Sequence, residues 1–157
     1  MRPTMIRIAV LATLSTSILP AASPDATGVR VSRIVLDVAV DPAAGTLDET
    51  VALVVAGKDV SHLVFAIDEG LSVKTSRASE GVVDHRQAGS ELIVDLDPAL
   101  DAARTLTFTI GGKPRKGTAT AIDPERVVLA PSAAWYPQLR NTWATTALTV
   151  RLPAGWT

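Results

Sequence analysis

Apolar and polar residues alternate along most of the chain from Val29 onward, a period of two that is typical of β-strands with one buried face. In the first alternating run, Val29 and Val31 lie in one phase and the following apolar residues lie in the other. This change of phase predicts a β-bulge near Ser32-Arg33. The residues that share a face after the bulge are Ile34, Leu36, Val38 and Val40.

A turn and a second alternating run come next. The turn extends from Asp41 to Gly45 and contains a proline and a glycine, which favour tight changes of direction. Two long alternating runs joined by a short turn predict a β-hairpin at the start of the fold. The residues that share a face in the second run are Leu47, Glu49, Val51, Leu53 and Val55.

Shorter alternating runs occupy most of the remaining chain and predict strands within 60–67, 71–77, 82–86, 92–96, 106–110 and 127–129. We expect Asp97-Pro98 to end the strand over 92–96, and Ala99 to Ala103 to form a single helical turn. Gly111 to Pro114 is expected to form a turn, and the polar stretch from Arg115 to Glu125 an exposed loop. With so little helix, the predicted fold is all-β: an antiparallel β-sandwich of about eight to ten strands.

The amino-terminal residues 1–22 have the composition of a secretory signal peptide. Arg2 and Arg7 are basic, the stretch from Ile8 to Leu19 is apolar, and small residues follow it. We expect cleavage after Ala21 or Ala22, with an uncleaved amino-terminal anchor as the alternative. The β-sandwich would then be a single exported domain over 27–157, located in the periplasm or secreted.

Composition excludes several classes of protein. The 157 residues are 47% hydrophobic and 20% charged, which is too apolar for a disordered chain. The net charge of −1 argues against a nucleic-acid or anionic-membrane partner, because both require a basic excess. The absence of cysteine from the sequence excludes disulfides, thiolate metal ligands and thiol catalysis.

The stretch from Ala133 to Thr157 holds all three tryptophans and the single tyrosine of the chain. It begins with the corner Trp135-Tyr136-Pro137 and ends in Pro153-Ala154-Gly155-Trp156. Between them, Thr145 to Leu152 alternates with many β-branched residues, which predicts a half-buried strand. The residues expected to share a face are Thr146, Leu148, Val150 and Leu152.

A W-Y-P corner, a short polar gap, an alternating strand and a P-x-G-W ending resemble the amino-terminal β-domain of M1-type (gluzincin) zinc aminopeptidases, in the divergent bacterial branch. The resemblance covers Val29 to Thr157 and includes the long opening hairpin. It implies a domain that closes just before a separate catalytic domain begins. In that family the strand over 106–110 ends in a tyrosine-containing turn, whereas here Ile110 stands in the tyrosine's place.

The resemblance also implies where a substrate-binding residue of the amino-terminal domain would lie. Active M1 aminopeptidases carry there a glutamine or glutamate that holds the free amino group of the substrate. Aligning Tyr136-Pro137 with the family's corner places this residue near Val128 or Leu129, which are apolar. Glu125 is a few residues away, and we do not assign it the role.

No catalytic, cofactor-binding or metal-binding residue is predicted in this chain. The two histidines, His62 and His85, do not have the spacing of a zinc-protease motif. We expect His62 to be a surface or half-buried residue of a strand and His85 to be exposed in a hairpin; a site made from both with Asp84 has little support. No serine occupies a nucleophile elbow, and Gly111-Gly112 lacks the residues of a phosphate loop. Zinc is expected only in a catalytic domain.

The aromatic residues Trp135, Tyr136 and Trp143 have two interpretations. They form either a platform for a peptide or glycan, or the packing of a corner with part of its surface facing another domain. We favour the second. The leading hypothesis is a non-catalytic exported domain that shapes or caps an active site on the catalytic domain of an M1-like peptidase. The alternative is a free-standing periplasmic or secreted module that binds a peptide or glycan, and an intact enzyme is the least supported.

Overall fold

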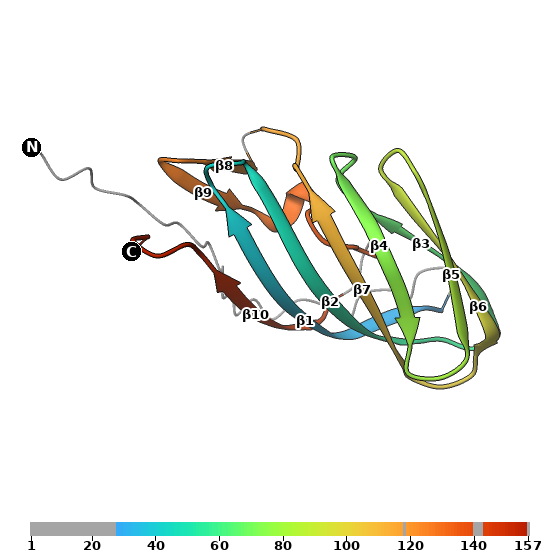
Figure 1. Cartoon of the computed structure of the whole chain (residues 1–157). Helices are drawn as coiled ribbons and strands as arrows, with labels where there is room; N and C mark the ends of the chain where they lie inside the picture. The colour runs from blue at the N-terminus through green and yellow to red at the C-terminus, as the bar shows by residue number, and fades with distance from the viewer. Residues whose placement is uncertain (1–27, 118, 140–142, 157) are drawn as a thin grey trace, which may run out of the picture.

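The computed structural model describes residues 28–117, 119–139 and 143–156, which form ten strands and one short 3-10 turn. The predicted signal peptide lies outside these residues. Among the described residues, no helix is both long and apolar enough to span a membrane. The strands, shown in Figure 1, are β1 (Arg30–Asp41), β2 (Thr46–Ala56), β3 (Val60–Ala66), β4 (Leu71–Ala78), β5 (Val82–Ala88), β6 (Glu91–Leu100), β7 (Arg104–Gly112), β8 (Thr120–Asp123), β9 (Arg126–Leu129) and β10 (Thr145–Arg151), with η1 over Pro131–Ala133.

The larger sheet has five strands in the order β10-β1-β2-β7-β4. The predicted opening hairpin is confirmed: β1 and β2 pair antiparallel around the Asp41–Gly45 turn, where the Asp41 carboxylate accepts bonds from the N–H groups of Ala43 and Ala44. The predicted bulge is also confirmed, because the register of β1 against β2 shifts between Val31 and Arg33. At the edge, β10 pairs with β1 in parallel.

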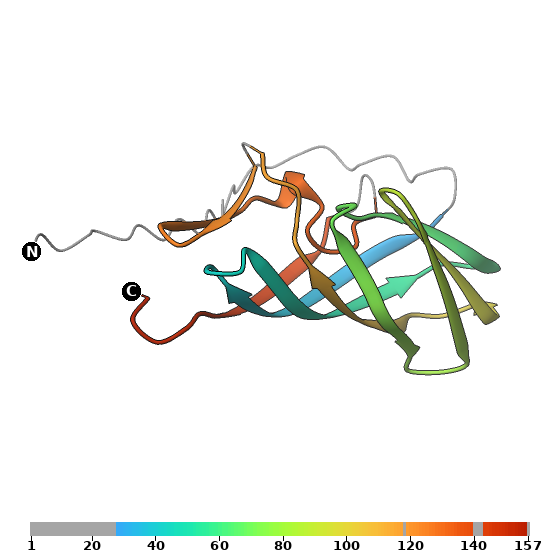
Figure 2. The same ribbon diagram turned by 45° about the horizontal axis from the view of Figure 1, so that its top comes forward.

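The second layer consists of a three-stranded sheet in the order β3-β6-β5 and the β8–β9 hairpin. Figure 2 shows the hairpin over one end of the larger sheet and the three-stranded sheet over the other. The core lies between the layers, where the Phe65 and Phe108 rings meet edge to face with centroids 6.0 Å apart. The all-β sandwich predicted from the alternation is therefore confirmed.

The predicted end of a strand at Asp97-Pro98 is wrong, and so is the helical turn over Ala99 to Ala103. β6 continues through the proline to Leu100. Proline has no N–H to donate, but β6 leaves β5 after Asp97 and next pairs with β3 at Leu100, so Pro98 interrupts no ladder position. Leu100 is fully buried, and its burial keeps the chain extended where local sequence favours a turn.

The stretch from Arg115 to Glu125 is not one exposed loop as predicted, because it contains β8. Thr120, Ala121 and Ile122 are buried. Ile122 lies against the turn of the first hairpin, where its carbonyl oxygen would be 3.3 Å from a Cβ added at Gly45. Contact with a distant part of the chain therefore buries this segment.

Candidate functional site

The segment that follows β9 crosses from the hairpin to the three-stranded sheet. Ala134 adopts a left-handed conformation (φ 48°) directly after η1, and its carbonyl accepts a 2.8 Å hydrogen bond from the N–H of Asp68. Gln138 then pairs with Ala66 through two backbone hydrogen bonds of 2.8 and 2.9 Å. Residues 134–138 are thus fixed by backbone hydrogen bonds at both ends beside the end of β3. We call Trp135, Tyr136 and Pro137 within this segment the aromatic corner.

The aromatic corner is part of the core. Trp135 is 3% exposed, and its ring meets that of Tyr136 edge to face with centroids 4.9 Å apart. Trp143 differs, since 77% of its surface is exposed. The interpretation of the aromatics as corner packing therefore holds for Trp135 and Tyr136, whereas Trp143 lies on the surface.

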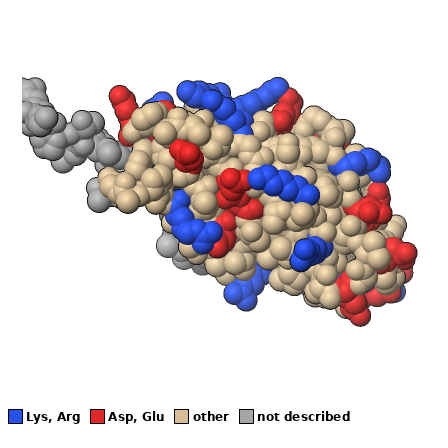
Figure 3. Space-filling view, viewed as in Figure 1, with Lys and Arg blue, Asp and Glu red and all other residues tan. Residues whose placement is uncertain are grey.

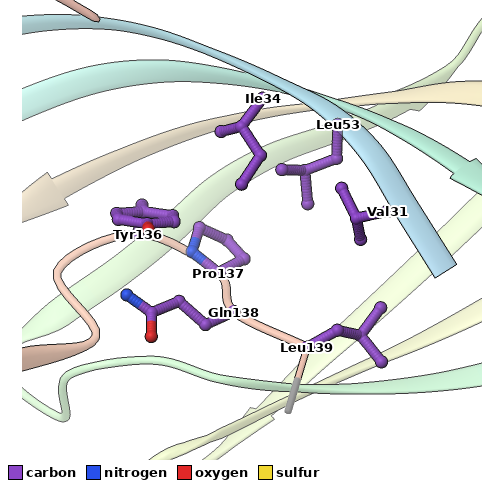
Figure 4. A pocket seen from close by; sticks show the side chains of 7 residues that line it. All are labelled: Val31, Ile34, Leu53, Tyr136, Pro137, Gln138 and Leu139. Atoms are coloured by element: carbon purple, nitrogen blue, oxygen red, sulfur yellow. The ribbon is translucent and has the colours of Figure 1, made fainter. Parts of the chain in front are cut away.

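A shallow cavity of about 80 Å³ separates the aromatic corner from the first hairpin. In Figure 4, the Pro137 ring faces apolar side chains of the hairpin, and the Gln138 amide points away from them. That amide donates a 2.5 Å hydrogen bond to the carbonyl of Pro131. The volume is well below the roughly 300–1,000 Å³ of ordinary ligand pockets. The lining residues are Val31, Ile34, Leu53, Tyr136, Pro137, Gln138 and Leu139.

Glu49 is a buried acid on the face of β2 that packs into the core. It is 4% exposed, and neither carboxylate oxygen has a hydrogen-bond partner among the described residues. Burial raises the pKa of Glu49 from its ordinary 4.5 to about 8, so the side chain is neutral at pH 7. The pKa of Tyr136 is also raised, mainly because the phenol is partly buried and secondarily because of electrostatic repulsion by Glu49. The acid thus lies within electrostatic reach of the aromatic corner.

Sequence reasoning placed Glu49 on the buried face but gave it no role. The signal was present, because it is the only acid among the core-facing positions of the second alternating run. Nothing in the sequence indicates whether a partner lies opposite it.

The two histidines lie on opposite faces of the three-stranded sheet. His62 is on the outer face, as expected, and bonds to Asp95 at 2.7 Å, while Arg86 bonds to the other oxygen of the same carboxylate at 2.9 Å. These bonds and the positive charges lower the pKa of Asp95. His85 is half-buried, against the expectation of an exposed hairpin residue: it packs toward β4, where Ser76 Oγ lies 2.7 Å from its Nδ1.

This arrangement does not assemble a zinc site. The described residues contain no group of three or more potential metal-binding side chains. His62 and His85 are separated by the sheet itself, so the zinc of an M1 peptidase does not fit the residues described here.

Gly111 and Gly112 are the last residues of β7 and do not form a turn, which corrects the prediction. They pair with Asp48 and Leu47 of β2 on one side and with β4 on the other. The ion pair between Lys74 and Asp48, 2.5 Å long, crosses directly over Gly111, where a Cβ atom would collide with both side chains. These two side chains are exposed and could move aside, so the stricter requirement for glycine lies at Gly112, where φ is 147° and a Cβ atom would lie 2.4 Å from the carbonyl oxygen of Gly70.

Val128 and Leu129, the positions that align with the substrate-binding residue of the family, are half-buried in β9 and pair with β8. Glu125 is exposed in the turn between these strands. The side chains of Val128 and Leu129 are apolar and cannot bond to an amino group. On the surface in Figure 3, basic and acidic side chains lie next to one another and are not separated by sign.

No protein-family model and no curated protein sequence matches this chain. Solved structures do match its fold. The M1 zinc metallopeptidase from Deinococcus radiodurans aligns at a TM-score of 0.65 and 21% identity, over 81% of this chain and 33% of that one. A mutant of that enzyme bound to a Tyr-Ser-Ala substrate gives a TM-score of 0.68 at 18% identity, with the same coverage.

Native leukotriene A4 hydrolase from yeast aligns at a TM-score of 0.62 and 14% identity, over 86% of this chain and 26% of that one. The chain thus spans a third or less of the length of these proteins. Its fold is that of the amino-terminal domain of M1 zinc metallopeptidases, which confirms the resemblance found in the sequence.

Proposed function

We propose that this chain is the non-catalytic, exported amino-terminal domain of an M1-like zinc metallopeptidase, and that it shapes or caps an active site carried by a catalytic domain. The observation that carries the proposal is the coverage of the structural match. Most of this chain, 81%, aligns with only 33% of a metallopeptidase that binds a peptide substrate. The matched third is the amino-terminal domain.

The arrangement of the histidines, the cavity and Glu49 favours a structural role for this domain over a catalytic one. The histidines lie on opposite faces of a sheet, and the cavity at the aromatic corner is too small for a peptide or a sugar ring. The buried acid Glu49 is closed off from solvent. A hydrolytic zinc ion and its general base would therefore be supplied by the catalytic domain.

The exposure of Trp143 supports contact with another domain. An indole that is 77% exposed leaves a large apolar surface in water, and surfaces of this kind commonly mark interfaces. Trp143 also precedes β10, the strand after which the family's catalytic domain begins. We propose that the catalytic domain covers this side chain.

The test is the mass of the native protein in the cell envelope, combined with sequencing of the transcript beyond Thr157. We expect either a larger polypeptide with a His-Glu-x-x-His motif downstream, or a separate zinc peptidase that co-purifies with this chain. Adding that catalytic domain should blue-shift the fluorescence of Trp143, and Trp143→Ala should remove the shift.

The opposite result is a protein of the mass of this chain without its leader and with no associated peptidase. It would overturn the proposal. Saturable binding of a peptide or glycan by that isolated protein would then establish the alternative, a free-standing binding module.

A further inference from the structure

β10 is an open edge of the larger sheet. It pairs with β1 through seven consecutive residues without a register shift, and no other described strand pairs with it. In a parallel ladder, alternate residues direct their N–H and C=O groups toward the neighbouring strand, and the others direct them away from it. The far side of β10 therefore presents a regular row of backbone donors and acceptors.

The edge lacks the features that usually prevent strands from pairing. The β10 sequence, TTALTVR, contains no proline, no lysine and no bulge, and most of its residues favour extended structure. Its single charge is engaged within the chain, because Arg151 donates a 2.9 Å hydrogen bond to Oδ2 of Asp37 on β1 and forms an ion pair with the same carboxylate. Within β10 itself, therefore, no unpaired charge is present to repel a further strand.

The core-facing side of β10 is also largely uncovered. Leu148 lies beside Leu36 in the parallel ladder, so the two side chains point to the same face of the sheet. Leu36 is 2% exposed, whereas Leu148 is 39% exposed. The second layer thus covers β1 and, among the residues of β10, partly buries only Val150.

We propose that two copies of this chain associate through β10, paired antiparallel about a two-fold axis at Leu148. The occupant is a second copy because the strand is complementary to itself in this register. Leu148 meets Leu148, Thr146 meets Val150 and Ala147 meets Thr149, which places the apolar residues on the same uncovered face.

Charges also agree with this register. Arg151 lies opposite Thr145 of the other copy, and the two arginines are at opposite ends of the paired strands. The interface is isologous, so it closes at two subunits and joins two five-stranded sheets into one continuous sheet. This inference goes beyond the proposed function and does not depend on a catalytic domain.

A charge-swap experiment tests both the partner and the register. We expect the purified full chain to sediment as a dimer, and both Leu148→Lys and Leu148→Glu to sediment as monomers, because like charges would face each other at the two-fold axis. An equimolar mixture of the two variants should recover the dimer, since opposite charges then meet. Val64→Lys, at an exposed position of β3, is the matched control and should leave the dimer intact.

Crosslinking provides a second measurement that does not depend on introducing charge. The chain has no cysteine, so Leu148→Cys introduces a single thiol. Directly opposed residues of antiparallel strands have Cβ atoms about 4.5–5.5 Å apart, within reach of a short bis-maleimide. We expect a covalent dimer from Leu148→Cys and none from Val64→Cys.

A monomer at all concentrations, with no crosslinking at position 148, would overturn the inference. So would dimers of both charged variants alone, because they would show that association occurs elsewhere. If β10 instead binds a catalytic domain, the wild-type chain will be monomeric and Leu148→Lys will weaken that complex. This outcome supports the proposed function and refutes the self-association.

Discussion

The aromatic corner and β10 lie close together in the sequence and differ in almost every physical respect. Both contain apolar residues, but Trp135 is 3% exposed whereas every β10 residue except Val150 is exposed. The corner is held between the first hairpin and the end of β3, while among the described strands only β1 pairs with β10. Burial is set here by what lies across from a segment, and much less by its own composition.

The largest expected effect concerns the buried acid near the corner. The pKa of Glu49 is about 8 in the folded chain and close to its ordinary 4.5 when unfolded, a difference that corresponds to about 5 kcal/mol. Below pH 4.5 both states hold the proton and no stability is lost. As the pH rises from 4.5 to 8, the unfolded state ionises first, so the free energy of unfolding falls and then levels off.

Glu49→Gln should remove this fall, as measured by urea unfolding at a series of pH values. Asp48→Asn is the matched control, because Asp48 is the neighbouring residue on the exposed face of the same strand. It should leave the pH dependence of the wild type unchanged. If Glu49→Gln retains the full loss of stability between pH 4.5 and 8, Glu49 is not its source.

The two tryptophans test the comparison directly. Trp135→Ala should lower the free energy of unfolding by about 3–5 kcal/mol, because it empties a filled position in the core. Trp143→Ala should change it by less than about 0.5 kcal/mol in the isolated chain. Chemical denaturation followed by circular dichroism measures both, and equal losses would show that the corner and the surface tryptophan are not distinct.

Two leucines that are neighbours in the parallel ladder provide a finer test. Leu36→Ala should cost about 2–5 kcal/mol, since its side chain is enclosed by the second layer. Leu148→Ala should cost about 1 kcal/mol or less in the monomer, because much of its surface is already in water. The measurement is urea unfolding at low protein concentration. A similar cost for both would mean that β10 is covered as fully as β1.

Much of the fold follows from the alternation in the sequence. The opening hairpin, its bulge and the strands through Leu63, Phe65 and Phe108 are local patterns that the structure reproduces. β8 was missed because only four residues form it, and its burial comes from contact with the distant Asp41–Gly45 turn. The strand through Pro98 was missed because local turn signals were outweighed by the burial of Leu100.

The candidate site was less predictable than the fold. Sequence periodicity correctly assigned Glu49 to a buried face, but whether a buried acid has a partner depends on segments that are distant in the sequence, such as the one that holds Tyr136. The same limit applies to β10. Its alternation predicts a strand with one buried face, but in the structure only Val150 of that face is partly buried. Period two specifies which side chains share a face, but not what packs against that face.

The smallest expected effect concerns the ion pair that joins β10 to β1. Arg151 and Asp37 are both substantially exposed, and exposed pairs contribute about 0–1 kcal/mol because solvent screens the charges and ordering the side chains costs entropy. Arg151→Ala should therefore lower stability by no more than about 1 kcal/mol, and the loss should shrink further in 1 M salt. A double-mutant cycle with Asp37→Ala isolates the pair. A coupling of several kcal/mol would mean that β10 is anchored as firmly as the aromatic corner, and that the contrast between the two segments lies in exposure alone.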